Sequence, residues 1–215
     1  MSPNVRLTTE EKNKGDCMIL KNLILVNRSY RRFHQESPID ESTLLELVDL
    51  ARLSASGGNT QQLKYVLSCD AERNAMIFPQ LAWAASLPDW PGPPEGERPS
   101  GYIVIVLDTS ISKGFGCDHG IAAQSILLGA TERGLGGCMI GSIQRKALHK
   151  ALALPERYEI VLVIALGKPK ETVVIEEVTD GSTKYWRDDK GRHHVPKRAL
   201  KDIILKPNQP DSGDS

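Results

Sequence analysis

Two unbroken apolar runs constrain the fold of this chain more than any other feature. The segments "YIVIVL" (102–107) and "IVLVIAL" (160–166) are rich in β-branched residues and have the length of buried strands. Both are far shorter than the roughly 20 apolar residues that cross a bilayer. The chain has 215 residues, enough for one domain with a real core. Helical patterns alternate with these strands, which predicts a single domain of the α+β or α/β class.

The remaining elements follow from periodicity and from turn residues. Asp40 is expected to cap a helix whose apolar face carries Leu44, Leu47, Val48 and Ala51. A short strand is expected at 65–69, an irregular proline-rich loop at 88–99, and a glycine-rich turn leading into an extended segment at 134–142. The tail is expected to be a polar loop followed by a helix that begins near Pro196. Helical spacing marks residues 17–26, 41–53, 71–87 with an interruption near Pro79, 118–134 with small residues on one side, and 145–154.

Composition excludes several classes of protein. The chain has 27 basic and 27 acidic residues, so it lacks the net positive charge of a broad nucleic-acid-binding surface. We expect no nucleic-acid partner and no membrane association. The N-terminus has no apolar signal segment, and four cysteines are scattered without a C-x-x-C pair. We therefore expect free thiols, no metal site and a cytoplasmic location.

Familiar catalytic motifs do not occur. The glycines at 114, 116 and 120 are spaced one residue too widely for G-x-G-x-x-G, and they do not directly follow a strand. The sequence contains neither a P-loop nor the G-x-S-x-G turn of a serine hydrolase. Asp118 is expected to cap its helix, and the adjacent His193 and His194 should diverge in an extended segment. The sequence therefore predicts no protein nucleophile.

The strongest functional signal is the basic segment "NRSYRRF" (27–33). Arg28 and Arg31 flank Ser29 directly after a predicted helix, where guanidinium groups, a hydroxyl and backbone N–H groups suit a phosphate. Arg32 should point elsewhere if the segment is extended, and we interpret it as a surface charge. A second basic pair, Lys197 and Arg198, stands at the start of the predicted terminal helix, which also favours a phosphate.

A second signal is the amide-rich loop "SASGGNTQQ" (54–62). Asn59, Gln61 and Gln62 offer both hydrogen-bond donors and acceptors, and the glycines allow a ligand to approach the backbone. Such groups suit the mixed edge of a pyrimidine-like ring. A phosphate clamp, an amide loop and a glycine-rich turn outside a dinucleotide fold are consistent with flavin mononucleotide (FMN).

Five segments in order resemble the FMN-dependent nitroreductase family, over residues 17 to 205. "NRSYRRF" resembles its opening R-S-x-R-x-F segment, and "SASGGNTQQLKYVL" resembles its small-residue loop before a strand. The other three are "DHGIAAQSILLGATERGLGGCMIGSI", similar to the central helix and Gly-Leu-Gly turn, "YEIVLVIALGKPKE", and "VPKRALKDII". Departures are Asn27, where another basic residue is common, and Gln62–Leu63 in place of Pro-Trp.

The resemblance implies an α+β fold with a central, mostly antiparallel sheet flanked by helices, and an intertwined homodimer that shares two FMN sites. By family likeness, Arg28, Ser29 and Arg31 would bind the phosphate and the ribityl chain, with Arg198 and Lys197 completing the clamp. Asn59 and Gln61 would reach the flavin ring from the partner subunit. Leu135, Gly136 and Gly137 would lie beside the ring, where a backbone N–H can reach N5.

The implied activity is that of an FMN-dependent NAD(P)H oxidoreductase. NADH or NADPH would reduce the flavin, and a small acceptor such as a nitroaromatic or a quinone would oxidise it in ping-pong order. Arg31 is the candidate cation near the N1/O2 edge. The implied FMN-binding domain spans residues 15–206, between flexible ends at 1–14 and 207–215, and residues 88–99 would form a loop or lid over the substrate pocket. The alternatives are a flavin-consuming or ring-modifying enzyme, a dehalogenase-like reductase, a non-catalytic flavin-binding protein, or an interaction module without a cofactor.

Overall fold

The computed structural model describes residues 14–205 and divides the chain into two compact units. The first unit contains residues 14–83 and 91–170, and the second contains residues 84–90 and 171–205. Apart from Lys14, the terminal segments predicted to be flexible, 1–14 and 207–215, lie outside the described residues.

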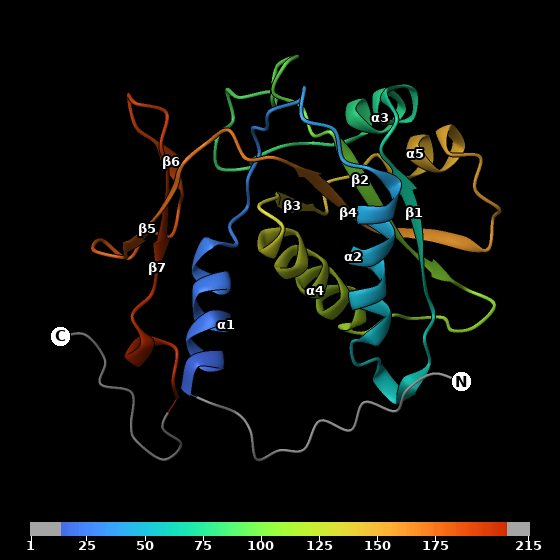
Figure 1. Cartoon of the computed structure of the whole chain (residues 1–215), viewed down its shortest axis with the longest axis horizontal. Coiled ribbons are helices and arrows are strands. Elements are labelled where there is room, and N and C mark those ends of the chain that lie inside the picture. Colours follow the sequence, from blue (N-terminus) through green and yellow to red (C-terminus); the bar gives the residue numbers. More distant parts are fainter. Residues whose placement is uncertain (1–13, 206–215) are drawn as a thin grey trace. The chain divides into compact units, whose positions relative to one another are not determined.

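A four-stranded antiparallel sheet forms the centre of the first unit (Figure 1). Its order is β1-β2-β4-β3, and its strands are β1 (Leu63–Ser68), β2 (Gly101–Asp108), β4 (Tyr158–Gly167) and β3 (Gly136–Ile140). Every residue of β2 is buried, as its unbroken apolar run predicts. The predicted strands and the α+β class are confirmed.

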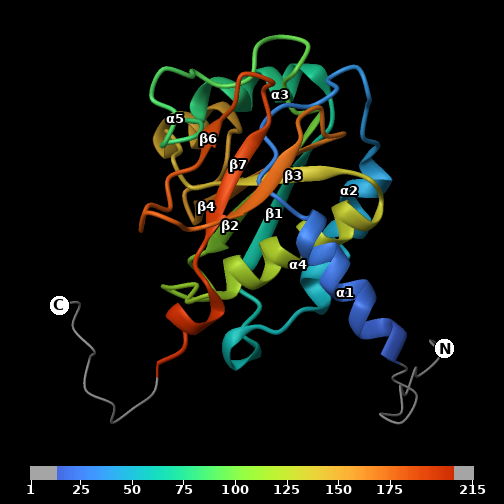
Figure 2. The ribbon, with the colours of Figure 1, turned by 90° about the vertical axis from the view of Figure 1, so that its left-hand side faces the viewer.

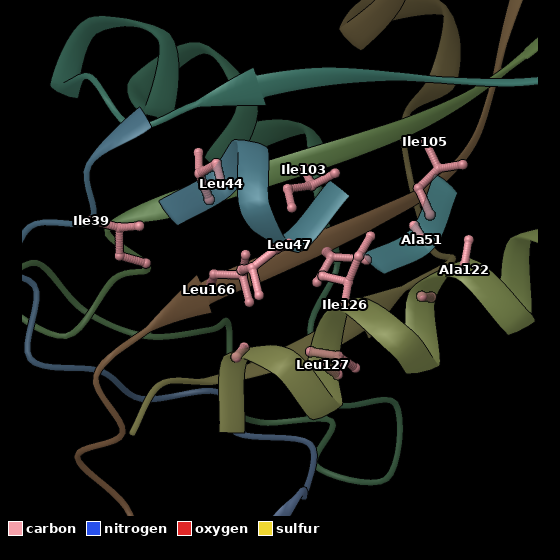
Figure 3. Close-up of a cluster of buried hydrophobic side chains, with 13 residues drawn as sticks. Ile39, Leu44, Leu47, Ala51, Ile103, Ile105, Ala122, Ile126, Leu127 and Leu166 are labelled. Atoms are coloured by element: carbon pink, nitrogen blue, oxygen red, sulfur yellow. The ribbon is translucent and has the colours of Figure 1, made fainter. Parts of the chain in front are cut away.

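Helices cover both faces of this sheet. On one face, α2 (Glu41–Leu53) and α4 (Asp118–Glu132) lie side by side (Figure 1). On the other face lie α3 (Ala71–Ile77) and α5 (Arg145–Ala151) (Figure 2). Because side chains alternate along a strand, Ile103 and Ile105 join the core under α2 and α4 (Figure 3), and their neighbours point to the opposite face. A further helix, α1 (Lys14–Val26), precedes the basic segment.

The start of α2 and its packing against α4 follow from local sequence. The side chain of Asp40 accepts a hydrogen bond from the Thr43 N–H at 2.6 Å, as predicted for the cap. Leu44 and Leu47, on the inner face of α2, are fully buried. A Cβ at Gly129 would clash with the Leu50 side chain and lie 3.1 Å from that of Leu47, so a larger residue there would require these leucines of α2 to shift. The small-residue side predicted for α4 is thus its contact with α2.

One helix is shorter than its periodicity predicts. α3 ends at Ile77 and continues only as a 3₁₀ turn over Phe78–Gln80. Pro79 lacks the N–H that a further helical turn requires, and Leu81 instead forms an isolated bridge with Ile143. The predicted continuation of the helix to residue 87 is wrong.

The second unit contains a small sheet that the sequence does not predict. Its order is β5-β7-β6, with β5 (Val173–Glu177) parallel to β7 (His193–Lys197) and β6 (Trp186–Arg187) antiparallel to it. The predicted helix near Pro196 is wrong, because Pro196 lies within β7. β6 pairs only with His193 and His194 and does not extend as far as Pro196. The N–H that Pro196 lacks is therefore not needed for a hydrogen bond to β6. Only a 3₁₀ turn, Leu200–Asp202, follows.

Polar contacts hold this unit together. The fully buried carboxylate of Glu171 pairs with Arg187 at 3.0 Å, and the Arg187 guanidinium lies 4.2 Å from the centre of the Trp90 ring. The ring of His193 packs on Tyr185, whereas His194 bonds to Glu176 at 2.7 Å, so the two histidines diverge as predicted. The bond to Glu176 raises the pKa of His194.

Candidate functional site

The basic segment lies against the start of β3. Ser29 forms an isolated parallel bridge with Gly137, and the Tyr30 N–H donates to the Gly137 carbonyl at 3.0 Å. A Cβ on Gly136 would lie 2.5 Å from the Tyr30 ring, and one on Gly137 would lie 2.6 Å from the Ala165 carbonyl oxygen. Glycine is therefore required at both positions. Folding thus brings together two of the segments singled out in the sequence, 28–31 and 135–137.

Arg28 is only partly satisfied by the protein. Its Nη2 donates to the Ile24 carbonyl at 2.5 Å, and its Nε is buried without a hydrogen-bond partner among the described residues. An unpaired donor on a buried charged group costs free energy that a bound anion would offset. Ser29 is exposed beside it, and Arg31 donates from Nη1 to the Ser29 carbonyl at 3.2 Å. This end of the site offers donors to a ligand.

Arg32 is not a plain surface charge, and that interpretation is wrong. Its guanidinium forms two hydrogen bonds with the carboxylate of Glu97, at 2.5 and 2.8 Å, and 31% of its side chain is exposed. Lys170 approaches the same carboxylate at 3.1 Å. These cations lower the pKa of Glu97 to about 2.

The same contacts hold the proline-rich loop. The Phe33 N–H donates to the Glu97 carbonyl at 3.0 Å. The Gln35 side-chain oxygen accepts from the N–H groups of Gly96 and Arg98 at 2.7 and 3.1 Å. Residues 96–98 are therefore fixed to the chain that directly follows the basic segment.

The amide loop is organised by Asp118. This buried carboxylate accepts hydrogen bonds from the Ser56 hydroxyl (2.7 Å), the Gly57 N–H (3.0 Å) and the Gln62 amide (3.1 Å). The bonds from Ser56 and Gly57 lower the pKa of Asp118. Asp118 is the first residue of α4 and makes no capping bond, so the predicted role as a helix cap is wrong. Its hydrogen bonds instead join the two ends of the amide loop, at Ser56–Gly57 and at Gln62.

The loop holds its two exposed amides in an unusual backbone conformation. Asn59 has φ of 55° and Gln61 has φ of 54°, values that most side chains avoid. The Gln61 amide donates to the Asn59 side chain at 3.2 Å. A cavity of about 260 Å³ lies beside the loop, lined in part by Ser56, Gln61, Tyr65 and Asp118. Positive φ outside glycine is often retained at functional sites.

The two parts of the first unit that carry predicted site residues lie at opposite ends of α4. Asp118 begins this 15-residue helix next to the amide loop, and Gly136 and Gly137 follow its last turn. A helix of that length spans about 20 Å. Within one chain, Asn59 and Gln61 are therefore not brought to Arg28 and Ser29.

The remaining predicted site residues belong to the second unit. Lys197 is the last residue of β7, Arg198 follows it, and both are exposed. No helix begins at these residues, so no helix N-terminus contributes to a phosphate site there. Their place in the phosphate clamp stays a prediction.

Asp118 and Glu97 organise these loops, yet sequence reasoning missed Glu97 and gave Asp118 only the role of a helix cap. Their side-chain partners lie 56 to 73 positions away in the chain, a separation that local patterns do not report. The one available signal is their setting, since Asp118 stands among small residues and Glu97 lies in the proline-rich segment.

Among the described residues, no group of three or more His, Cys, Asp and Glu side chains could hold a metal ion. Cys69 and Cys117 are free. None of the helices in the described part of the chain combines the length and apolar character needed to cross a membrane.

An antiparallel sheet between helical layers, with a basic segment docked on its glycine-rich edge strand, defines an α+β fold shared with solved nitroreductases. One example is an FMN-dependent nitroreductase from Clostridium difficile R20291, with a TM-score of 0.60 at 19% identity. The match covers 87% of this chain and 98% of that structure.

The model of the nitroreductase family matches residues 24–92 and 115–168, more than half of the chain. The chain therefore belongs to the nitroreductase family. A candidate NADH dehydrogenase/NAD(P)H nitroreductase of Archaeoglobus fulgidus is 26% identical over 166 residues, covering 74% of this chain and 90% of the relative. The 5,6-dimethylbenzimidazole synthase of Rhodospirillum rubrum is 26% identical over 180 residues, covering 70% and 82%. The predictions of the family, of its fold and of an oxidoreductase enzyme are confirmed.

Proposed function

We propose that the chain is an FMN-dependent NAD(P)H oxidoreductase that passes electrons to a small organic acceptor, such as a nitroaromatic or a quinone. Bound FMN would accept hydride from NADH or NADPH and return the electrons to the acceptor in ping-pong order. The observation that carries the proposal is the buried Nε of Arg28, unpartnered among the described residues and adjacent to Ser29 and the β3 glycines. The names of the relatives support both cofactors.

The side chains present fit this cofactor. Arg28, Ser29 and Arg31 would hold its phosphate and ribityl chain, and Lys197 and Arg198 would add positive charge to the clamp. The backbone of residues 135–137 would lie along the ring. Arg31 would stabilise negative charge that develops at the N1/O2 edge. No protein nucleophile is required.

We further propose a homodimer in which each FMN site combines Arg28 of one protomer with Asn59 and Gln61 of its partner. The separation of these groups along α4 supports sharing. Exposed apolar side chains on α1 support an interface, since Leu20, Ile24, Leu25 and Val26 are 46–56% exposed in the single chain. The free cysteines support a reducing, cytoplasmic location.

Anaerobic stopped-flow spectroscopy tests the activity. The purified protein should be yellow, and its flavin absorbance should bleach with NADH or NADPH and return when a quinone or nitroaromatic is added. A yellow protein that bleaches with neither donor would instead be a flavin-binding protein without this activity. A colourless protein that cannot be loaded with FMN would exclude the flavin proposal altogether.

Complementation between variants tests the sharing of sites. Arg28→Ala and the double variant Asn59→Ala/Gln61→Ala should each bind FMN poorly. After unfolding and refolding together, mixed dimers should recover one intact site, because one site then carries both defects and the other carries none. If each chain binds FMN by itself, no recovery is possible.

A second candidate is a flavin-consuming or ring-modifying reaction, because one relative is named as a synthase of 5,6-dimethylbenzimidazole. Incubation of the FMN-loaded protein with NADPH in air separates the two reactions. Full recovery of FMN absorbance supports the oxidoreductase, whereas irreversible loss with this product detected by mass spectrometry supports the synthase.

We also propose that residues 88–99 shape the acceptor pocket. Shortening the loop before the anchored residues 96–98 should change the ranking of acceptors while FMN stays bound. Loss of FMN would count against this role.

A further inference from the structure

A second cavity, of about 190 Å³, lies where β2 begins and α3 passes over it. None of its lining residues belongs to segments 27–31, 56–62 or 135–137, which carry the proposed FMN contacts of the first unit. The residues that line it are Gln35, Pro38, Cys69, Ala71, Asn74, Ala75, Phe78, Arg98, Pro99, Ser100 and Tyr102.

Arg98 contributes a positive charge that no carboxylate neutralises within the described residues. Its guanidinium carbon lies 4.4 Å from the centre of the Phe78 ring, so one face of the group is covered. Its Nε is buried and has no hydrogen-bond partner in the described part of the chain. The neighbouring carboxylate, Glu97, is committed to Arg32 and Lys170. The edge of the Arg98 guanidinium therefore retains free donors.

Further hydroxyl groups line the same cavity. Ser100 is 7% exposed, and its Oγ has no partner among the residues that the structure describes. Tyr102 is 1% exposed, and burial raises the pKa of its phenol, an effect that the charge of Arg98 partly opposes. Arg98 and Ser100 both line this cavity, and each has a buried side-chain atom without a hydrogen-bond partner among the described residues.

Negative charges near the cavity limit what it can bind. Burial and the carboxylates of Glu41 and Asp70 raise the pKa of the Cys69 thiol, which lines the cavity. Asp70 is occupied as the cap of α3 and accepts from the Arg73 N–H at 2.7 Å. An anion should therefore be small and should bind at Arg98, away from Cys69.

We propose that this cavity is a binding site for a small oxyanion, a carboxylate or inorganic phosphate, held by the Arg98 guanidinium edge and the Ser100 hydroxyl. A planar carboxylate matches the guanidinium fork, and a phosphate offers the same oxygen acceptors. The backbone N–H of Arg98 is bonded to Gln35, so the site is built on the anchored end of the proline-rich loop. The site is independent of the proposed FMN chemistry.

Isothermal titration of the FMN-loaded protein with sodium acetate, and separately with sodium phosphate, tests the proposal. Sodium chloride keeps the ionic strength constant in both titrations. We expect saturable one-to-one binding of at least one anion with a Kd on the order of 1 mM. The acetate and phosphate arms show whether the natural ligand is a carboxylate or a phosphate.

Two variants and a matched control locate the binding. Arg98→Gln should weaken binding about tenfold or more, because it removes charge-assisted hydrogen bonds. Ser100→Ala should weaken it about threefold, in line with the loss of one neutral hydrogen bond. Arg73→Gln should bind like the wild type, because Arg73 is an exposed arginine of α3 that donates to the Leu67 carbonyl.

The proposal is overturned if neither anion binds saturably, or if Arg98→Gln binds as tightly as the wild type. It is also overturned if Arg73→Gln loses binding to the same extent as Arg98→Gln. Thermal melting and FMN absorbance are recorded for every variant. If Arg98→Gln melts far below the wild type, the Ser100→Ala titration decides the question.

Discussion

The polar clusters at the two ends of α4 differ in whether the protein itself satisfies their hydrogen-bonding groups. At its first residue, Asp118 binds the Ser56 hydroxyl, the Gly57 N–H and the Gln62 amide, so that cluster is closed by the protein itself. Beyond its last turn, the basic segment docks on β3, yet the buried Nε of Arg28 finds no partner among the described residues.

This difference separates scaffold from ligand-binding groups. Substitutions in a closed cluster remove protein hydrogen bonds and should reduce stability first. Substitutions in an open cluster remove donors that the fold does not use, so they should reduce ligand binding first. Stability and FMN affinity should therefore respond differently at the two ends of α4.

The largest effect is expected for Arg28→Ala. It should weaken FMN binding about 100-fold, because a charge-assisted contact to the phosphate is lost. The free energy of unfolding of the FMN-free protein should change by less than about 1 kcal/mol, since an unpaired buried donor is removed as well. Fluorescence titration of FMN and urea unfolding measure the two quantities. Arg157→Ala, an exposed arginine of the same unit, is the control.

Asp118→Ala should show the opposite pattern. Loss of one carboxylate leaves three donors without their acceptor and should lower the free energy of unfolding by about 2 kcal/mol. Urea unfolding of the FMN-free protein checks this value. Asp49→Ala is the matched control, because its exposed pair with Arg52 should contribute less than about 0.5 kcal/mol. Equal losses from both variants would contradict the closed character of the cluster.

Within the basic segment, we expect substitution of Arg31 to affect mainly FMN binding and substitution of Arg32 to affect mainly stability. Arg31→Ala should weaken FMN binding about tenfold, the loss expected for one ionic contact. Arg32→Ala should instead lower the free energy of unfolding by about 1–2 kcal/mol. Glu97→Gln should reproduce the Arg32→Ala loss of stability if the ion pair is the cause. Equal effects of the two arginine variants on FMN would refute the division.

The smallest effect is the acid sensitivity of the amide loop. The pKa of Asp118 is lowered in the folded protein. Its contribution to stability is therefore complete above the unfolded pKa of about 3.9 and is lost as pH falls through the lower, folded value. Hydrogen exchange at the Gly57 amide should accelerate in that acidic window, relative to amides in β2. Asp118→Asn should lack this acid-dependent part of the exchange.

The elements of the first unit could be predicted because their signals are local. Asp40 precedes an amphipathic run and caps α2, and unbroken β-branched runs become β2 and β4. The glycine-rich turn at 134–142 is likewise evident from composition, and it becomes β3. Such signals require no knowledge of distant partners.

The sheet of the second unit could not be predicted for the same physical reason. β5 and β7 are five residues each, β6 is two, and their side chains are mostly half-buried or exposed. Their pairing depends on contacts such as Glu171 with Arg187, and Pro196 in β7 argues locally against a strand. The same limit hid the contacts of Asp118 and Glu97, although Arg28, Ser29 and the β3 glycines were visible as motifs.

The bonds of Glu97 have a consequence for engineering this family member. Arg32, Glu97 and Lys170 come from three distant positions in the chain but form one ionic unit. A proline-rich loop transplanted from another nitroreductase would therefore leave Arg32 and Lys170 without their carboxylate, unless that loop carries an acidic residue at position 97. Loop libraries that aim at new acceptors should hold residue 97 constant and vary the prolines before it.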